Sequence, residues 1–162
     1  MTIADHDTGE ASMMKTAIAA ALAASLLAAC TTTPEPSDPL TGTSWRLLEM
    51  QSMDDAQGAA RADKPDRYTV TFGEDGIAFL KLDCNRARGS YETQSTGASQ
   101  GSLRFGNIAS TMAMCPPDSL SETLGRQLGF VRSYVIRDGR LNMALMADGG
   151  ILVWEPTEID AP

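Results

Sequence analysis

Short runs of alternating apolar and polar residues follow one another through most of the chain after residue 42. Such alternation places one face of a strand in a core and the other in water, so these runs are typical of antiparallel β-strands. They lie at 43–50, 68–72, 77–82, 102–106, 133–137, 141–145 and 151–155. We predict a mainly β (α+β) domain of about 7–8 strands, built as a strongly curved antiparallel sheet or partly closed β-barrel.

Turn residues stand between the runs. Asp-Gly pairs at 75–76 and 138–139 predict β-hairpins, because glycine readily adopts the positive φ of a tight turn. The segments 51–66 and 93–101 are polar and contain many small residues, so we predict loops there.

One segment has the period of a helix. Its apolar stripe consists of Leu120, Leu124, Leu128 and Val131. Ser119 and Glu122 have the spacing of a capping box, which predicts that the helix starts next to the prolines at 116–117. Gly125 and Gly129 weaken the helical pattern, so we expect one short helix packed on the sheet.

The N-terminal part contains an uncharged apolar run at 17–29, directly before Cys30. The run has the length of a signal-peptide core and is shorter than the roughly 20 residues of a membrane span. Lys15 supplies the positive flank, and small residues precede the cysteine. This resembles the lipobox of bacterial lipoproteins, which implies cleavage before Cys30 and lipidation of its thiol. The alternative is a buried Ala-rich helix that ends in a cysteine by chance.

The acidic start of the chain does not fit a signal peptide, so we expect translation to begin at Met13 or Met14. Residues after Cys30 are rich in Thr and Pro, which predicts a flexible tether. Thr31 follows the lipidated position, and by resemblance to lipoprotein sorting it favours the outer membrane. The expected organisation is a mis-assigned extension at 1–12, a signal peptide at 13–29, a lipid-anchored tether at 30–42, a domain at 43–156 and a tail at 157–162.

The charge and histidine content exclude several functions. The formal net charge of −8 gives no attraction to a phosphate backbone, so we expect no nucleic-acid partner. The sole histidine, His6, lies in the segment expected to be removed. A mature chain without histidine cannot use a Ser-His-Asp or Cys-His mechanism or a His-containing zinc site. We therefore predict no enzyme activity, no cofactor and no metal site.

Cys84 and Cys115 remain after lipidation of Cys30, an even number in an oxidising compartment. We predict a disulfide between them. Two buried free thiols are the alternative, and a redox pair is disfavoured because there is no C-x-x-C spacing and no flanking base.

Polar residues beside the cysteines form a candidate contact site for an anionic or peptide-like ligand: Asn85, Arg86, Arg88 and Thr111. The structural alternative is that Asn85 and Gly89 make a turn while the arginines are solvated or pair with Asp83. The methionines are predicted to fill the core, with binding of a soft metal or an apolar partner as the alternative; they are Met112, Met114, Met143 and Met146.

Several blocks in fixed order resemble the META domain (HslJ-like) family. They are L-T-G-T-S-W-R-L, F-G-E-D-G, D-C-N-R-A-R-G-S-Y, L-R-F-G-N-I-A-S-T-M-A-M-C and D-G-x-L-N-M, between Leu40 and Glu155. The resemblance implies a mostly β, barrel-like fold, a bacterial envelope location and an association with stress or antibiotic tolerance. It implies no reaction.

Together these features predict a lipid-anchored, monomeric outer-membrane protein whose domain lies in the periplasm and supports envelope integrity or stress tolerance. Its expected partners are the membrane, through the lipid, and an unknown envelope protein or cell-wall component. One alternative is a small-molecule binder in a barrel-like pocket. A further alternative is a glycan hydrolase, which would need two acids about 5–10 Å apart among Asp83, Glu92 and Asp118.

Overall fold

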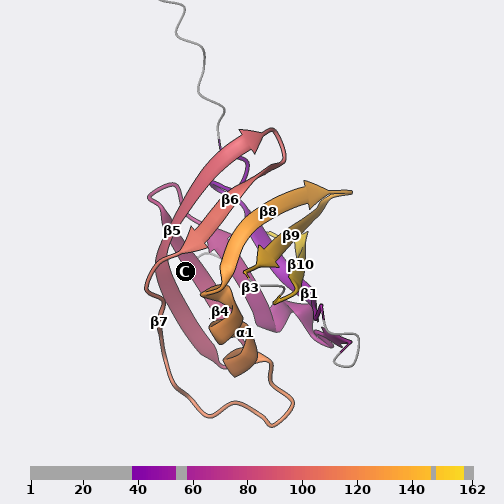
Figure 1. Cartoon of the computed structure of the whole chain (residues 1–162). Helices are drawn as coiled ribbons and strands as arrows, with labels where there is room; N and C mark the ends of the chain where they lie inside the picture. Colours follow the sequence, from indigo (N-terminus) through magenta and orange to yellow (C-terminus); the bar gives the residue numbers. More distant parts are fainter. Residues whose placement is uncertain (1–37, 54–57, 147–148, 159–162) are drawn as a thin grey trace, which may run out of the picture. The chain divides into compact units, whose positions relative to one another are not determined.

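The computed structural model describes residues 38–53, 58–146 and 149–158 (Figure 1). The expected extension, signal peptide and lipidated Cys30 lie outside the described residues. The elements are β1 (Ser44–Gln51), β2 (Ala59–Arg61), the 3-10 helix η1 (Pro65–Arg67), β3 (Tyr68–Phe72), β4 (Ile77–Leu82), β5 (Asn85–Gly97), β6 (Gln100–Phe105), β7 (Ala109–Ser110), α1 (Ser121–Leu128), β8 (Val131–Arg137), β9 (Arg140–Leu145) and β10 (Ile151–Pro156). No described helix has the length and apolar character needed to cross a membrane.

The sheet closes on itself into a barrel. Its strands pair antiparallel in the order β1-β3-β4-β5-β6-β8-β9-β10, and β10 pairs back to β1. The short strands β2 and β7 are added to β1 and β5, respectively. The predicted fold class is confirmed as a closed eight-strand antiparallel barrel with two extra strands and one short helix.

Side chains from the inner faces of the strands fill the barrel. The largest fully buried ones include Trp154, Tyr134, Phe72, Leu47, Leu103, Leu141 and Met143. The helix α1 lies at one end of the barrel, where Leu124 and Leu128 join the same core (Figure 1). Trp45 also belongs to this core, as expected for an aromatic residue beside the β1–β10 seam.

Both predicted Asp-Gly hairpins are present. Gly76 has a φ of +74°, and the turn between β8 and β9 has φ values of +54° at Asp138 and +72° at Gly139. Two successive positive φ values match the twist of the flanking strands, which explains the preference for Asp-Gly. The register pairs Ile136 with Leu141, so the apolar residues of this hairpin face each other.

Two predicted loops contain strands. The segment 93–101 forms the end of β5 and the start of β6. Its small polar side chains point alternately to the two faces of the sheet, as apolar side chains do in any strand. Gly101 permits this pairing, since a Cβ there would lie 2.4 Å from the Gln94 carbonyl oxygen. The segment 51–66 likewise contains β2 and most of η1.

The folded domain begins before Thr43, inside the segment assigned to the tether. Leu40 is fully buried in the core. The carboxylate of Asp38 accepts a hydrogen bond from the Leu40 amide and another from the Thr93 hydroxyl on β5. The chain is therefore fixed to the barrel at least from residue 38.

The helix begins later than its pattern predicts, and the capping box is absent. Leu120 occupies the N-cap position, and no side chain caps the helix. The Leu120 amide instead donates to the Tyr68 hydroxyl on β3, at 2.9 Å. Glu122 pairs with Arg126 on the exposed face of the helix, so it does not reach back to Ser119.

Candidate functional site

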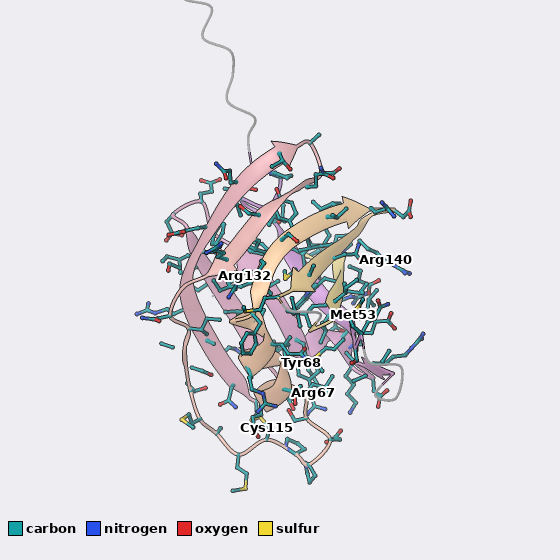
Figure 2. All side chains as sticks on the ribbon, viewed as in Figure 1. Met53, Arg67, Tyr68, Cys115, Arg132 and Arg140 are labelled. Atoms are coloured by element: carbon teal, nitrogen blue, oxygen red, sulfur yellow. A yellow bond between two sulfur atoms is a disulfide. The ribbon has the colours of Figure 1, made fainter. Side chains whose placement is uncertain are left out.

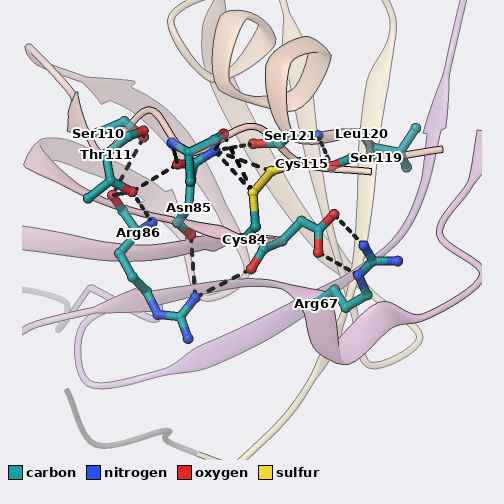
Figure 3. The surroundings of a disulfide bond; sticks show 12 residues. Arg67, Cys84, Asn85, Arg86, Ser110, Thr111, Cys115, Ser119, Leu120 and Ser121 are labelled. Atoms are coloured by element: carbon teal, nitrogen blue, oxygen red, sulfur yellow. Dashed lines mark hydrogen bonds and ion pairs between the residues drawn. A yellow bond between two sulfur atoms is a disulfide. The ribbon is translucent and has the colours of Figure 1, made fainter. Parts of the chain in front are cut away.

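The structure contains the predicted disulfide between Cys84 and Cys115 (Figure 3). Cys84 lies in the two-residue turn between β4 and β5, and Cys115 follows β7 in a segment without regular structure. Their Cα atoms are 5.6 Å apart. The bond therefore ties the segment after β7 to the beginning of β5, beside α1. Figure 2 shows Cys115 near Arg67 and the helix at this end of the barrel.

Asn85 fixes the same segment through its side-chain amide. Its Oδ1 accepts hydrogen bonds from the Thr111 hydroxyl at 2.9 Å and from the Ala113 amide at 2.8 Å. Its Nδ2 donates to the Ala113 carbonyl at 3.2 Å and to Cys115 Sγ at 3.3 Å. Asn85 is buried, and its amide is already used within the chain.

The predicted turn at Asn85 and Gly89 is wrong, because both residues lie in β5. The turn consists of the two preceding residues, Asp83 and Cys84, and Asp83 has a φ of +61°. Gly89 has a different role: a Cβ there would lie 2.8 Å from the Asn107 carbonyl oxygen. It therefore allows the chain after β6 to pass close to β5.

Arg67 holds the strained turn and was not foreseen from the sequence. Its guanidinium donates to both carboxylate oxygens of Asp83, with Nε 2.5 Å from Oδ1. Its Nη1 also lies 3.8 Å from Oδ2 of Asp118. The structural alternative had the arginines solvated or paired with Asp83, and Arg86 donates only to the backbone carbonyl of that residue, with no ion pair to its carboxylate. Burial raises the pKa of Asp83, but hydrogen bonds from Arg67 and Ser119 outweigh burial and hold that pKa below its ordinary value.

The lowered pKa of Asp83 makes stability sensitive to acid. Above about pH 4 the ion pair stabilises the folded state, and this contribution is lost as the pH falls through the folded-state pKa, since the unfolded chain then binds more protons. Asp83→Asn keeps a residue that tolerates positive φ but removes the ionisable group. We expect the variant to be less stable at pH 7 and to lose less unfolding free energy than the parent on acidification, as measured by urea denaturation.

The matched control for this prediction is Asp138→Asn. Asp138 is the other aspartate with positive φ, and it is exposed and has no ion pair among the residues that the structure describes. Its acid dependence should follow that of the parent. An Asp83→Asn curve that also parallels the parent would show that the Arg67 pair contributes no pH dependence.

A groove of about 840 Å³ lies on the outer face of β3, β4 and β5, with β7 and Thr111 as its wall. The register aligns Thr69, Lys81 and Arg86 in one row across the three strands. The neighbouring row aligns Thr71, Phe79 and Arg88. The full lining is Thr69, Thr71, Phe79, Leu80, Lys81, Arg86, Ala87, Arg88, Ala109, Ser110 and Thr111.

The groove is positively charged, because its lining includes Lys81, Arg86 and Arg88 but no acidic residue. Its lining contains no aspartate, glutamate, histidine or cysteine. Among the described residues, no carboxylate lies within ion-pair distance of Lys81, Arg86 or Arg88. Arg46, on the adjacent strand β1, is by contrast paired with Asp66 and Glu155, each at 2.7 Å. Three cations that lack an acidic partner in the described part of the chain thus line one groove of a protein whose net charge is −8.

The structure brings three of the four predicted contact residues together: Arg86, Arg88 and Thr111 line the groove. Asn85 faces the other side of β5 and holds the wall. Lys81 and Phe79 belong to the groove but were not singled out from the sequence, because only the β4–β5 register places them beside the arginines.

The acids considered for a glycan hydrolase lie outside the groove. Asp83 and Asp118 both contact Arg67, and Glu92 lies farther along β5, opposite Arg104. None of them lines the groove. Among the described residues, no three His, Cys, Asp or Glu side chains form a group that could hold a metal.

The methionine prediction is correct for Met143 and wrong for the pair before Cys115. Met143 is fully buried, whereas Met112 and Met114 are 96% and 99% exposed. The prediction is also wrong for Met146, which is 42% exposed and lies outside the core. The side chains of Met112 and Met114 thus add nothing to the core.

The fold and the groove define a closed β-barrel domain with a cationic groove on its outer wall. The META domain family matches residues 38–158, and the chain belongs to this family, as the sequence blocks indicated. The matched residues coincide with the barrel and with the segment from Asp38 that is bound to it.

Solved structures share this fold. An NMR structure of a protein from Burkholderia xenovorans matches with a TM-score of 0.59 and 22% identity, covering 81% of this chain and 96% of that one. A crystal structure of a DUF4847 family protein from Bacteroides vulgatus ATCC 8482 matches with a TM-score of 0.51 and 11% identity, covering 75% and 96%, respectively. No curated protein matches the chain.

Proposed function

We propose that this protein is a non-enzymatic, lipid-anchored component of the bacterial outer membrane that binds an anionic saccharide of the envelope in the outer groove. The observation that carries the proposal is the cluster of Lys81, Arg86 and Arg88, which has no acidic partner among the described residues. The lipobox before Cys30 supports the anchor and the periplasmic location of the domain.

The size and lining of the groove favour a saccharide over a free inorganic anion. Its lining comes from four strands, and neighbouring strands lie about 4.8 Å apart, so it spans roughly 14 Å. The hydroxyls of Thr71, Ser110 and Thr111 have partners within the chain and can still accept hydrogen bonds from sugar hydroxyls. The Phe79 ring offers an apolar surface to a sugar face. The cations would bind phosphate or carboxylate groups on the same molecule.

The residues that line the groove suit a site that binds a saccharide without cleaving it. General acid–base chemistry on a glycosidic bond needs paired carboxyl groups, and the lining supplies none. A small-molecule site inside the barrel is less favoured, because Trp154, Tyr134 and Phe72 occupy the interior.

The proposal is tested by titrating the full chain with a phosphorylated lipid A-type disaccharide and, separately, with a muropeptide that carries free carboxylates. The test variant is Lys81→Gln/Arg86→Gln/Arg88→Gln. Exposed charge pairs contribute about 0.7 kcal/mol each, so we expect this variant to bind roughly thirty-fold more weakly. The two ligands distinguish phosphate from carboxylate as the recognised group.

The matched control removes three exposed cations from other strands: Arg104→Gln/Arg137→Gln/Arg140→Gln. It changes the net charge equally, and Figure 2 shows Arg140 away from the Cys115 end of the barrel. Its affinity should stay within about two-fold of the parent, apart from long-range screening effects. Equal losses in both variants, or no binding of either ligand by the parent, would refute the groove as the binding site.

A further inference from the structure

The segment from Thr111 to Cys115 is tied to the barrel at three of its five residues. Thr111 and Ala113 bond to the Asn85 side chain, and Cys115 is joined to Cys84 (Figure 3). Thr111 is held by its hydroxyl, Ala113 by its backbone amide and carbonyl, and Cys115 by the disulfide. The two residues between them, Met112 and Met114, are almost completely exposed.

Both exposed thioethers therefore belong to one short, anchored segment. In any backbone conformation, the Cα atoms of residues two positions apart lie at most roughly 7 Å from each other. Methionine side chains have three rotatable bonds, so two sulfurs at this spacing can converge on one atom. An exposed methionine gives none of the hydrophobic stabilisation that a buried one gives. Core packing therefore does not explain why two methionines stand at these positions.

We infer that Met112 and Met114 form a bidentate thioether site for a soft monovalent cation, Cu(I). Thioether sulfur is a soft ligand that selects Cu(I) over the hard divalent cations. The anchors at Thr111 and Cys115 keep the two ligands near each other before the metal arrives, which lowers the ordering cost of binding. The inference goes beyond the saccharide groove and does not depend on it.

The site holds the cation at the surface. Two protein sulfurs leave other coordination positions open, and the described residues contain no group of three His, Cys, Asp or Glu side chains that would offer a competing site. The disulfide sulfurs are already bonded to each other and supply no thiolate. Such a site would bind Cu(I) reversibly and pass it to a stronger ligand.

The test uses the full chain carrying Cys30→Ser, so that no free thiol competes, with its methionine methyl groups labelled for NMR. The redox-inert cation Ag(I) is titrated in chloride-free buffer, and Cu(I) is then titrated anaerobically against a chelator. We expect the Met112 and Met114 methyl signals to shift together, to saturation, with one equivalent. Met112→Leu/Met114→Leu should abolish this binding, and either single substitution should weaken it on the order of tenfold or more, because the second sulfur then no longer binds intramolecularly.

The substitution to leucine keeps the apolar surface and removes only the sulfur, which separates metal binding from docking of an apolar partner. The control Met53→Leu/Met146→Leu removes the sulfurs of two other exposed methionines and should retain full binding. Ag(I) or Cu(I) affinity that survives Met112→Leu/Met114→Leu would overturn the inference. So would equal shifts of the Met53 or Met146 methyl signals at the same metal concentration.

Discussion

Replacing Trp154 with alanine is expected to lower the free energy of unfolding by about 3–5 kcal/mol. Trp154 is fully buried on β10, where it pairs with Leu47 of β1 on one side and Leu141 of β9 on the other. Its ring thus fills the core at the seam that closes the barrel. Urea denaturation followed by circular dichroism measures the loss directly.

Two further variants show whether volume at the seam is the cause. Trp154→Phe keeps an aromatic ring and removes an indole N–H that has no hydrogen-bond partner within the described part of the chain, so it should cost much less than alanine. Phe130→Ala truncates an aromatic residue that is 47% exposed and should cost less than about 1 kcal/mol. If Trp154→Ala were as mild as Phe130→Ala, the closed β1–β10 seam would not be what stabilises the barrel.

The second large effect is expected for Cys84→Ser/Cys115→Ser. The disulfide joins residues 31 positions apart, and closing such a loop in the unfolded chain contributes about 3–4 kcal/mol. The melting temperature of a domain of this size should fall by roughly 10–15 °C. Differential scanning calorimetry of the oxidised parent and the double variant measures the difference.

Reduction of the parent provides the matched comparison for the disulfide. The reduced parent and the double serine variant lack the same cross-link, so their melting temperatures should agree. The Asn85 bonds to Thr111 and Ala113 remain in both, so the native fold should persist at low temperature. A double variant as stable as the oxidised parent would mean that the Asn85 bonds alone restrain the segment.

The local parts of the fold could be predicted from the sequence because their signals are local. The Asp-Gly turns at 75–76 and 138–139 specify their hairpins through backbone conformation. Closure of the barrel could not be predicted in the same way, since β1 and β10 lie at opposite ends of the domain and meet only in the folded chain. The end of β5 was missed because its Ser, Thr, Gln and Gly residues have the composition of a loop.

The residues of the candidate site likewise fall into those that the sequence indicated and those that only the folded chain brings together. Arg86, Arg88 and Thr111 were found because they lie near the cysteines in the sequence, and the disulfide fixes that neighbourhood. Lys81 reaches the site only through the antiparallel register of β4 and β5. The exposure of Met112 has a tertiary cause too, because Asn85 binds the residues on either side of it. Composition alone placed this methionine in the core.

The most direct test of the proposed function is photocrosslinking in intact cells with a benzophenone amino acid at position 79, on the floor of the groove. Mass spectrometry should find an adduct that is an acidic saccharide, and the adduct should disappear when Lys81, Arg86 and Arg88 are replaced with glutamine. The same probe at position 137, at the far end of β8, should give no such adduct. The proposed function would be contradicted by a saccharide adduct that persists without the three cations, or by a polypeptide as the only crosslinked product.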